Sequence, residues 1–188
     1  MTNSFRSKQP KRICTKVYTN YRSYKPYIAE DFNHRCGYTD CSDFWFGGIN
    51  TFHIDHFKPL KNHPKLKNTY SNLVYCCSYV NILKSDDEGT YLDPCDIDYN
   101  AHFERDSNGN IIPINTSVEA KYMHSRLKLY LKRYQIIWKL DQLLLRMREL
   151  QNAIKDPKNS TIKQDLQILN SDLATELTSY VEYLSGNQ

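Results

Sequence analysis

The sequence has no long run of apolar residues. None of its 188 residues belong to a stretch approaching the roughly 20 apolar residues that a membrane-spanning helix needs. The first residues also lack the apolar core of a secretory signal peptide. We therefore expect a cytoplasmic protein without a membrane partner. Hydrophobic residues make up 40% and charged residues 24% of the chain, which is typical of a globular protein and argues against extensive disorder.

Acidic residues are missing from two long segments. Residues 1–29 contain seven Lys or Arg and no acid, and residues 57–85 contain five lysines and no acid. The formal net charge is only +4, so the segregation of charge is more informative than its total. It could create a face that attracts a polyanion such as nucleic acid. Separate solvated surfaces that never meet would explain the same pattern equally well.

Glycine and proline are also few, and they mark expected boundaries in the first third of the chain. Residues 1–15 are polar and basic without periodicity, which favours a loose arm. Pro26 can begin a short helix. Residues 36–56 resemble two short strands separated by Gly47-Gly48. Apolar and polar residues alternate over 51–56, as expected for a half-buried strand.

The rest of the chain changes from mixed to helical patterns. The segment from Leu73 to Leu83 favours either a helix or a strand followed by a helix, and Asn108-Gly109 predicts a hairpin turn. Thr116-x-x-Glu119 has the form of a capping box before a long helix that should stop near Asp156-Pro157. Leucines at helical spacing from 166 to 184 predict a second helix.

These patterns predict an α+β protein with a C-terminal antiparallel helical hairpin. We expect the domain boundary between a core at residues 1–115, which includes the basic N-terminal arm, and a helical extension at residues 116–188. The sequence contains no internal repeat that would suggest a different architecture.

The chemically informative side chains lie within residues 53–84. Hydrolysis of a phosphodiester needs a base to activate water, a cation to stabilise the developing charge, and positive groups that hold phosphates. His56 titrates near neutrality and can act as the base. Asp55 and Asn81 offer oxygen ligands to a hard divalent cation. Lys84 lies one helical turn beyond Asn81 and could reach a phosphate from the same helix face.

The ordered set Asp55-His56, Pro59, Asn72-Leu-Val and Asn81-x-x-Lys84 resembles the HNH, or ββα-metal, nuclease motif. Further similarity to bacterial stand-alone HNH proteins extends over more than half of the chain. The resemblance implies a ββα-metal core in which His56 is the general base. It implies that Asp55 and Asn81 bind Mg²⁺ or Mn²⁺, and that Asn72 braces the loop before the helix by backbone hydrogen bonds.

Three residues around this motif are candidates for substrate binding. They are Lys84, Lys58 and His53. On a strand His53 shares a face with Asp55 and could contact the metal or a phosphate, although a structural histidine is an equally good interpretation.

The chain departs from the motif at its cysteines. Many relatives carry two Cys-x-x-Cys pairs that bind structural zinc, but here Thr39 and Val80 replace the second cysteine of each pair. Cys36 and Cys77 remain as the first members. We expect no structural zinc and favour buried thiols. A rebuilt zinc site would need shifted ligands, for which the chain offers Cys41, Cys76 and Cys95.

Three functions are compatible with these residues. The first is a DNA endonuclease, with RNA as an open alternative because nothing in the motif recognises a 2′-hydroxyl. The second is a nucleic-acid-binding module with little cleavage activity. The third is an effector subunit that docks on a partner, since stand-alone HNH proteins are often paired with an ATPase in anti-phage defence, as in Septu-like and retron-linked systems.

Overall fold

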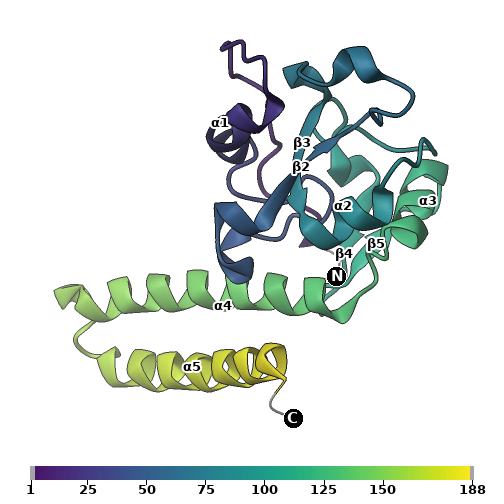
Figure 1. Ribbon diagram of the computed structural model, residues 1–188. Helices are drawn as coiled ribbons and strands as arrows, with labels where there is room; N and C mark the ends of the chain where they lie inside the picture. Colours follow the sequence, from purple (N-terminus) through teal and green to yellow (C-terminus); the bar gives the residue numbers. More distant parts are fainter. Residues whose placement is uncertain (1–2, 187–188) are drawn as a thin grey trace. The chain divides into compact units, whose positions relative to one another are not determined.

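The computed structural model describes residues 3–186 and has a mixed α/β fold with five α-helices and two small antiparallel sheets in that range (Figure 1). Two compact units divide the chain, Met1–Tyr134 and Gln135–Gln188. The division falls later than the boundary expected at 115/116. The reason is that helix α3 (Val118–Arg126) belongs to the first unit, where Ala120 and Met123 are completely buried.

A two-stranded sheet and the helix behind it form the centre of the first unit. Strand β2 (Phe52–His56) pairs antiparallel with β3 (Leu73–Cys77), and Asp55 faces Val74 in the register. All five residues of β3 are buried, and helix α2 (Ser78–Lys84) follows it directly. The expected strand at 51–56 is confirmed, and of the two alternatives for 73–83 the strand followed by a helix is correct.

A second sheet has the strand order β1-β4-β5. The hairpin of β4 (Phe103–Arg105) and β5 (Ile111–Pro113) is confirmed, and Gly109 has a φ of +91° in its turn. Strand β1 (Asn3–Ser4) pairs with β4. The expectation of a loose N-terminal arm is therefore wrong.

Buried contacts also hold the N-terminal segment in place. Phe5 is completely buried, and the Arg12 guanidinium donates to both carboxylate oxygens of Asp93 at 2.9 and 3.0 Å. Bidentate pairing of this kind is the strongest arrangement that arginine makes with a carboxylate. The basic residues of this segment thus serve packing as well as surface charge.

Helix α1 (Lys25–Asp31) begins with proline in its first turn, as predicted from Pro26. The first of the two strands expected within 36–56 is wrong, because this stretch contains 3₁₀ turns at Asp43–Phe46 and Ile49–Thr51 instead. The Ser42 hydroxyl accepts from the Phe44 amide to begin the first turn, and Gly47 ends it in the left-handed region.

The single long helix expected after residue 116 is two helices. Helix α3 ends at Arg126, and α4 (Lys132–Lys155) begins after a break in which Lys128 has a φ of +50°. The cap of α3 is Ser117 and not Thr116, since the Ser117 hydroxyl accepts from the Ala120 amide. Helix α4 does stop before Asp156-Pro157, as the sequence predicts.

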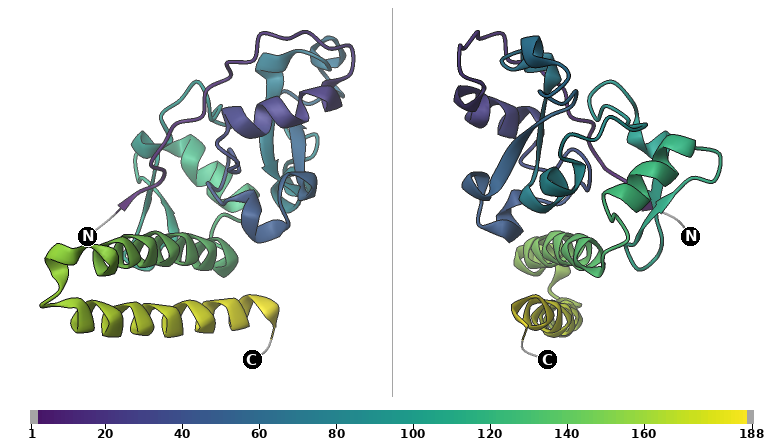
Figure 2. Two further views of the ribbon diagram at one scale, coloured as in Figure 1. Left: turned by 90° about the vertical axis from the view of Figure 1, so that its left-hand side faces the viewer. Right: turned by 45° about the vertical axis from the view of Figure 1, so that its right-hand side comes forward.

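The second unit is a helical hairpin. The part of α4 after Tyr134 and helix α5 (Lys163–Ser185) lie side by side and antiparallel (Figure 2). Helix α5 buries none of its side chains completely. Within the described residues, no helix has the length and apolar character to cross a membrane.

Candidate active site

A hollow of about 430 Å³ brings three of the candidate residues together. Strand β2 supplies Asp55 and His56 to its wall, and α2 supplies Asn81. The arrangement follows from local structure, because the helix continues directly from the strand that pairs with β2. Residues that are 25 positions or more apart along the sequence therefore line one cavity.

Asp55 is enclosed on the inner side of this hollow. Its carboxylate oxygen Oδ2 accepts a hydrogen bond from the Tyr38 hydroxyl at 2.7 Å and lies 3.1 Å from the Lys84 ammonium nitrogen. Only 4% of Asp55 is exposed. Burial and the neighbouring carboxylate raise the pKa of Tyr38 well above its ordinary value, so its hydroxyl keeps its proton and remains a donor.

Lys84 lies in the interior and not on the surface. It is completely buried, and its ammonium also donates to the backbone carbonyl of His56 at 2.9 Å. A buried ammonium needs such partners because an unpaired charge in the interior is costly. Lys84 therefore contacts Asp55 and the His56 backbone from the interior side, which does not suit the expected contact with a substrate phosphate. Its position allows it to orient the Asp55 carboxylate.

His56 is half-buried and has one ring nitrogen committed to the backbone. Its Nε2 donates to the carbonyl of Lys67 at 2.8 Å. A carbonyl can only accept, so the ring proton is on Nε2 and the lone pair is on Nδ1. Burial lowers the pKa of His56 below 6.5, against the opposing effects of the carbonyl and Asp55. The imidazole is thus mainly neutral at pH 7, as a general base must be.

Asn72 braces the chain that leaves the strand. Its side-chain oxygen accepts from the Lys58 amide at 2.8 Å, and its side-chain nitrogen donates to the Lys58 carbonyl at 3.0 Å. Asn72 is buried and does not line the hollow. It therefore acts as a positioning residue for the loop that follows the Asp55-His56 pair. The Lys58 side chain itself is exposed.

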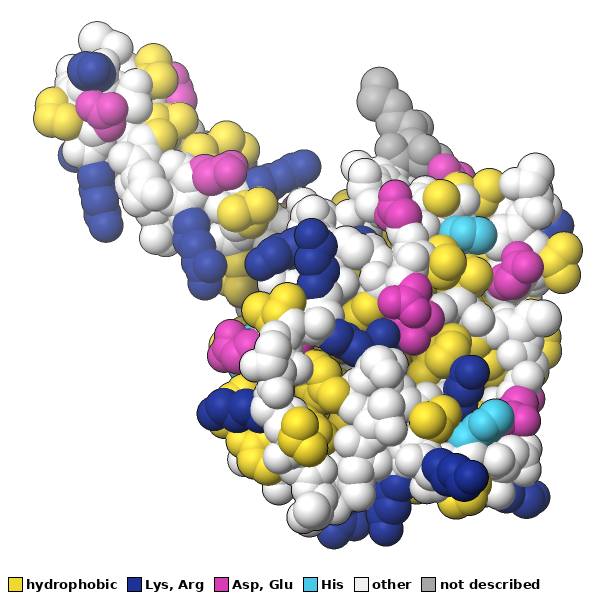
Figure 3. All heavy atoms as spheres, turned by 90° about the horizontal axis from the view of Figure 1, so that it is seen from above, with side chains coloured by type: hydrophobic (Ala, Val, Ile, Leu, Met, Phe, Trp, Pro, Cys, Tyr) yellow, Lys and Arg dark blue, Asp and Glu magenta, His cyan; other side chains and the backbone are white. Residues whose placement is uncertain are grey.

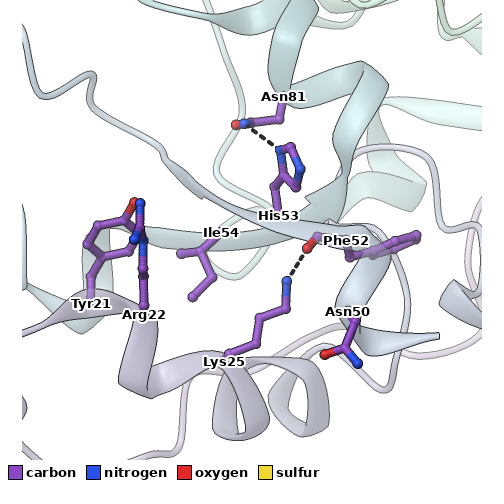
Figure 4. A pocket seen from close by; sticks show the side chains of 8 residues that line it. All are labelled: Tyr21, Arg22, Lys25, Asn50, Phe52, His53, Ile54 and Asn81. Carbon is purple, nitrogen blue, oxygen red and sulfur yellow. Dashed lines mark hydrogen bonds between the residues drawn. The ribbon is translucent and has the colours of Figure 1, made fainter.

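Asn81 and His53 contact each other at the opening of the site. The amide nitrogen of Asn81 lies 3.1 Å from Nδ1 of His53 (Figure 4). Burial, with a smaller effect of Lys25, lowers the pKa of His53, so the neutral ring accepts this bond. The contact leaves the Asn81 side-chain oxygen available to another ligand.

Asp55 and Asn81 line the same hollow and carry carboxylate and amide oxygens, which are the ligand types that a hard divalent cation takes together with water and phosphate. Within residues 3–186, no group of three or more His, Cys, Asp or Glu is arranged to enclose a metal ion. A cation here would thus be held by few protein atoms, as Mg²⁺ often is. It would also share the Asp55 carboxylate with Lys84 and Tyr38, which makes tight binding before substrate arrives unfavourable.

The two cysteines left from the expected pairs meet in the interior. The Sγ atoms of Cys36 and Cys77 are 4.0 Å apart, and both thiols are buried. By the resemblance they are the remaining first cysteines of two zinc-binding pairs, and two thiols alone do not complete a tetrahedral zinc site. The expectation that the protein carries no structural zinc stays a prediction.

Sequence reasoning missed two residues that shape the site. Tyr38 orients Asp55, and the Tyr21 ring packs edge-on against His56 with centroids 4.7 Å apart. Tyr21 belongs to a series of tyrosines at every third position, Tyr18, Tyr21, Tyr24 and Tyr27, but this spacing does not predict a contact with His56. Nothing in the sequence around Tyr38 distinguishes it from an ordinary core tyrosine.

Basic side chains are divided into several groups on one face of the molecule (Figure 3). On the face shown in Figure 3, Lys and Arg occur in several separate groups, with acidic and hydrophobic side chains between some of them. Attraction of a polyanion would then depend on particular cations near the hollow. No family model matches the chain, and neither a curated protein nor a solved structure shows detectable similarity to it.

Proposed function

We propose that this protein is a metal-dependent endonuclease of the HNH type that hydrolyses phosphodiester bonds in DNA. The observation that carries the proposal is the environment of His56. Its imidazole is neutral, and the hydrogen bond from Nε2 to the Lys67 carbonyl leaves the lone pair on Nδ1. His56 shares one hollow with Asp55 and Asn81. The strand–strand–helix order of β2, β3 and α2 agrees with the motif that the sequence resembles.

His56 would act on water. Its Nδ1 lone pair takes a proton from a water molecule as the water oxygen bonds to phosphorus. The bond between phosphorus and the leaving oxygen then breaks, and solvent supplies the proton for that oxygen. Because Nε2 stays bonded to the Lys67 carbonyl, the positive charge formed on the ring is stabilised by a fixed acceptor. The Tyr21 ring limits rotation of the imidazole.

Asp55 and Asn81 would hold Mg²⁺ or Mn²⁺. When bound, such an ion supplies positive charge to the phosphate during hydrolysis. Lys84 and Tyr38 keep the Asp55 carboxylate in one orientation through contacts of 3.1 and 2.7 Å. Lys84 thus contributes by positioning Asp55, and the phosphate contacts are left to other residues, for which Lys58 and His53 remain candidates.

Incubation with supercoiled plasmid, with Mg²⁺, Mn²⁺ or EDTA, tests the proposal. Replacement of His56 by alanine should reduce cleavage by about 10²- to 10⁴-fold, because a positioned base is lost. His63→Ala is the matched control, since His63 does not line the hollow. If the two variants cleave equally well, His56 is not the base.

A second candidate is a subunit that docks on a partner and cleaves little by itself. Helix α5 favours it, because Ile168, Leu169 and Val181 are exposed on the hairpin. An ATPase partner of a defence complex, implied only by the resemblance, could cover such residues. If the purified chain cleaves neither DNA nor RNA with either metal while remaining folded, this candidate replaces the first.

A further inference from the structure

A second hollow, of about 370 Å³, adjoins the candidate active site. Tyr21, Ile54 and Asn81 line both hollows, so the two are continuous along β2. We call the second one the cationic hollow. Its other lining residues come from the segments at either side of the strand: Arg22, Lys25, Asn50, Phe52 and His53 (Figure 4).

The lining of the cationic hollow has one sign of charge. It contains Arg22 and Lys25 and no carboxylate. In the described part of the chain, Arg22 forms no ion pair, and the ring of Tyr21 lies beneath its guanidinium at 5.9 Å. Its charge is therefore available to a ligand. The guanidinium fork is well suited to the oxygens of a phosphate.

Lys25 is held at the base of the same hollow. Its ammonium donates to the carbonyl of Phe52 (Figure 4). That bond uses one of three donors, so two remain for another acceptor. The ammonium is partly desolvated, since burial lowers the pKa of Lys25. An anion that enters the hollow would interact with it more strongly than with a fully hydrated surface lysine.

The spacing of the two hollows limits the kind of ligand. Lys25 contacts Phe52, and the candidate base is His56, four residues further along the strand. At roughly 3.3 Å per residue this separation is about 13 Å. A ligand that reaches both ends must be extended and must carry an anionic group away from the bond that is cut. A nucleic acid strand has this character, whereas a single phosphate group does not.

We propose that the cationic hollow binds the sugar-phosphate backbone of the substrate strand beside the cleaved bond, with Arg22 and Lys25 as phosphate ligands. Asn50 offers an amide to the same backbone. This inference rests on the proposed function because it places the substrate of that site. It assigns substrate binding to residues that the motif does not include, and it lets the strand run along β2 from the cationic hollow to His56.

Binding in EDTA tests the inference without cleavage. The probe is a fluorescein-labelled 12-nucleotide DNA, single-stranded or duplex, followed by anisotropy at several salt concentrations. The Arg22→Gln/Lys25→Gln variant should bind more weakly, and its salt slope should fall by about 1.4 for the single strand or about 1.8 for the duplex, since two phosphate contacts are lost. The control Lys121→Gln removes an exposed lysine of α3 that lines neither hollow.

A single Arg22→Gln variant guards against a structural role of Lys25. It should show about half of the fall in slope seen for the double variant, since one phosphate contact is lost instead of two. The Arg22 side chain makes no hydrogen bond or ion pair within the described residues, so its replacement should leave the fold intact. Unchanged affinity and slope in both variants, relative to Lys121→Gln, would overturn the inference. The thermal unfolding of each variant shows whether it is folded.

Plasmid cleavage separates this inference from the proposed function. The double variant should raise KM and leave kcat nearly unchanged, because the lost contacts lie away from the reacting bond. Cleavage with an unaltered KM contradicts the inference and leaves the nuclease proposal intact. A third outcome is that the wild-type protein does not cleave but the variants still bind the DNA more weakly than it does. That result would support the backbone contact and contradict the nuclease proposal.

Discussion

The two units differ in the side chains that they bury. The first encloses charges and pairs them, as Lys84 is completely buried against Asp55. Helix α5 of the second buries no side chain completely, and its Ile168 is 55% exposed. The comparison teaches that stability in the first unit depends strongly on individual polar contacts. On the outer face of α5 it should depend little on individual side chains.

The largest loss of unfolding free energy is expected from Lys84→Met. The substitution keeps most of the side-chain volume but leaves the Asp55 carboxylate buried without its cation. Removing one partner of a buried pair typically costs about 3–5 kcal/mol of unfolding free energy. Urea unfolding measures the loss. The exposed control Lys58→Met should change the same quantity by less than about 0.5 kcal/mol.

A compensating variant sharpens this test. Adding Asp55→Asn to Lys84→Met removes the uncompensated charge, so the double variant should be more stable than Lys84→Met alone. If the double variant is the less stable of the two, the charge pair is not what makes Lys84 important.

A smaller loss of unfolding free energy is expected at Asp87, which is an acid with hydrogen-bond partners nearer the surface. Burial disfavours the Asp87 carboxylate, but hydrogen bonds from Tyr122, Tyr91 and Arg126 outweigh this and lower its pKa to about 2. The stabilisation is complete above the ordinary pKa of 3.8 and is lost as pH falls from there to about 2. Asp87→Asn should cost about 1–2 kcal/mol at pH 7.

Unfolding of Asp87→Asn and wild type across a pH series checks this sign. The difference in stability between them should shrink between pH 4 and pH 2, a range estimated as roughly the interval between the two pKa values. A difference that is constant over the series would mean that the charge of Asp87 contributes nothing.

His56 is half-buried, between the interior of the first unit and solvent. Its pKa therefore measures how far the interior of this unit extends toward the candidate site. Because burial lowers its pKa from 6.5, the neutral, active form is retained at lower pH than in a free histidine. Cleavage should therefore rise with pH and reach half of its plateau below pH 6.5. The pH dependence of kcat/KM measures this point. A midpoint above 6.5 would show that the imidazole is more solvated, or more strongly paired, than described.

The smallest change in unfolding free energy is expected for substitutions on the exposed face of α5. Ile168→Ser should change the unfolding free energy by less than about 0.5 kcal/mol, as surface substitutions usually do. Leu177→Ala, at a half-buried position on the same helix, is the comparison and should cost more. A large loss from Ile168→Ser would remove the contrast between the two units.

Local signals predicted the elements whose causes are local. Pro26 marks the start of α1, the alternation before His56 marks β2, and Asn108-Gly109 marks the hairpin. Contacts between distant residues explain the errors. The N-terminal segment is ordered by Arg12 and its ion pair with Asp93, 81 positions away, which no window of neighbouring residues can reveal.

Two further errors come from backbone conformation. The helix expected after residue 116 breaks near Lys128, which adopts a φ of +50° although it is neither glycine nor asparagine. The strand expected before Gly47 is replaced by a 3₁₀ turn that Ser42 caps. In both places the local residues are compatible with more than one conformation, and tertiary packing selects between them.

The sequence predicted which residues line the candidate site, but it did not predict which way their side chains point. Residue order placed Asp55, His56 and Asn81 near one another, and all three line one hollow. Helical spacing placed Lys84 beside Asn81, but periodicity does not state which face of a short helix is buried. Lys84 turns inward to Asp55, so under the proposed function the substrate phosphates would need other ligands, for which we propose the residues of the cationic hollow.

The pairing of β2 with β3 also determines where an insertion or deletion is tolerable. Neighbouring residues of a strand point to opposite faces, so a slip of one position would exchange the directions of Asp55 and His56. The carboxylate would then leave Tyr38, and the imidazole would leave the Lys67 carbonyl. Changes of length should thus be accepted within residues 61–63, away from the Lys67 carbonyl and the Asn72 brace, and should disrupt the site within either strand. The environments of Asp55 and His56 thus depend on the register between β2 and β3.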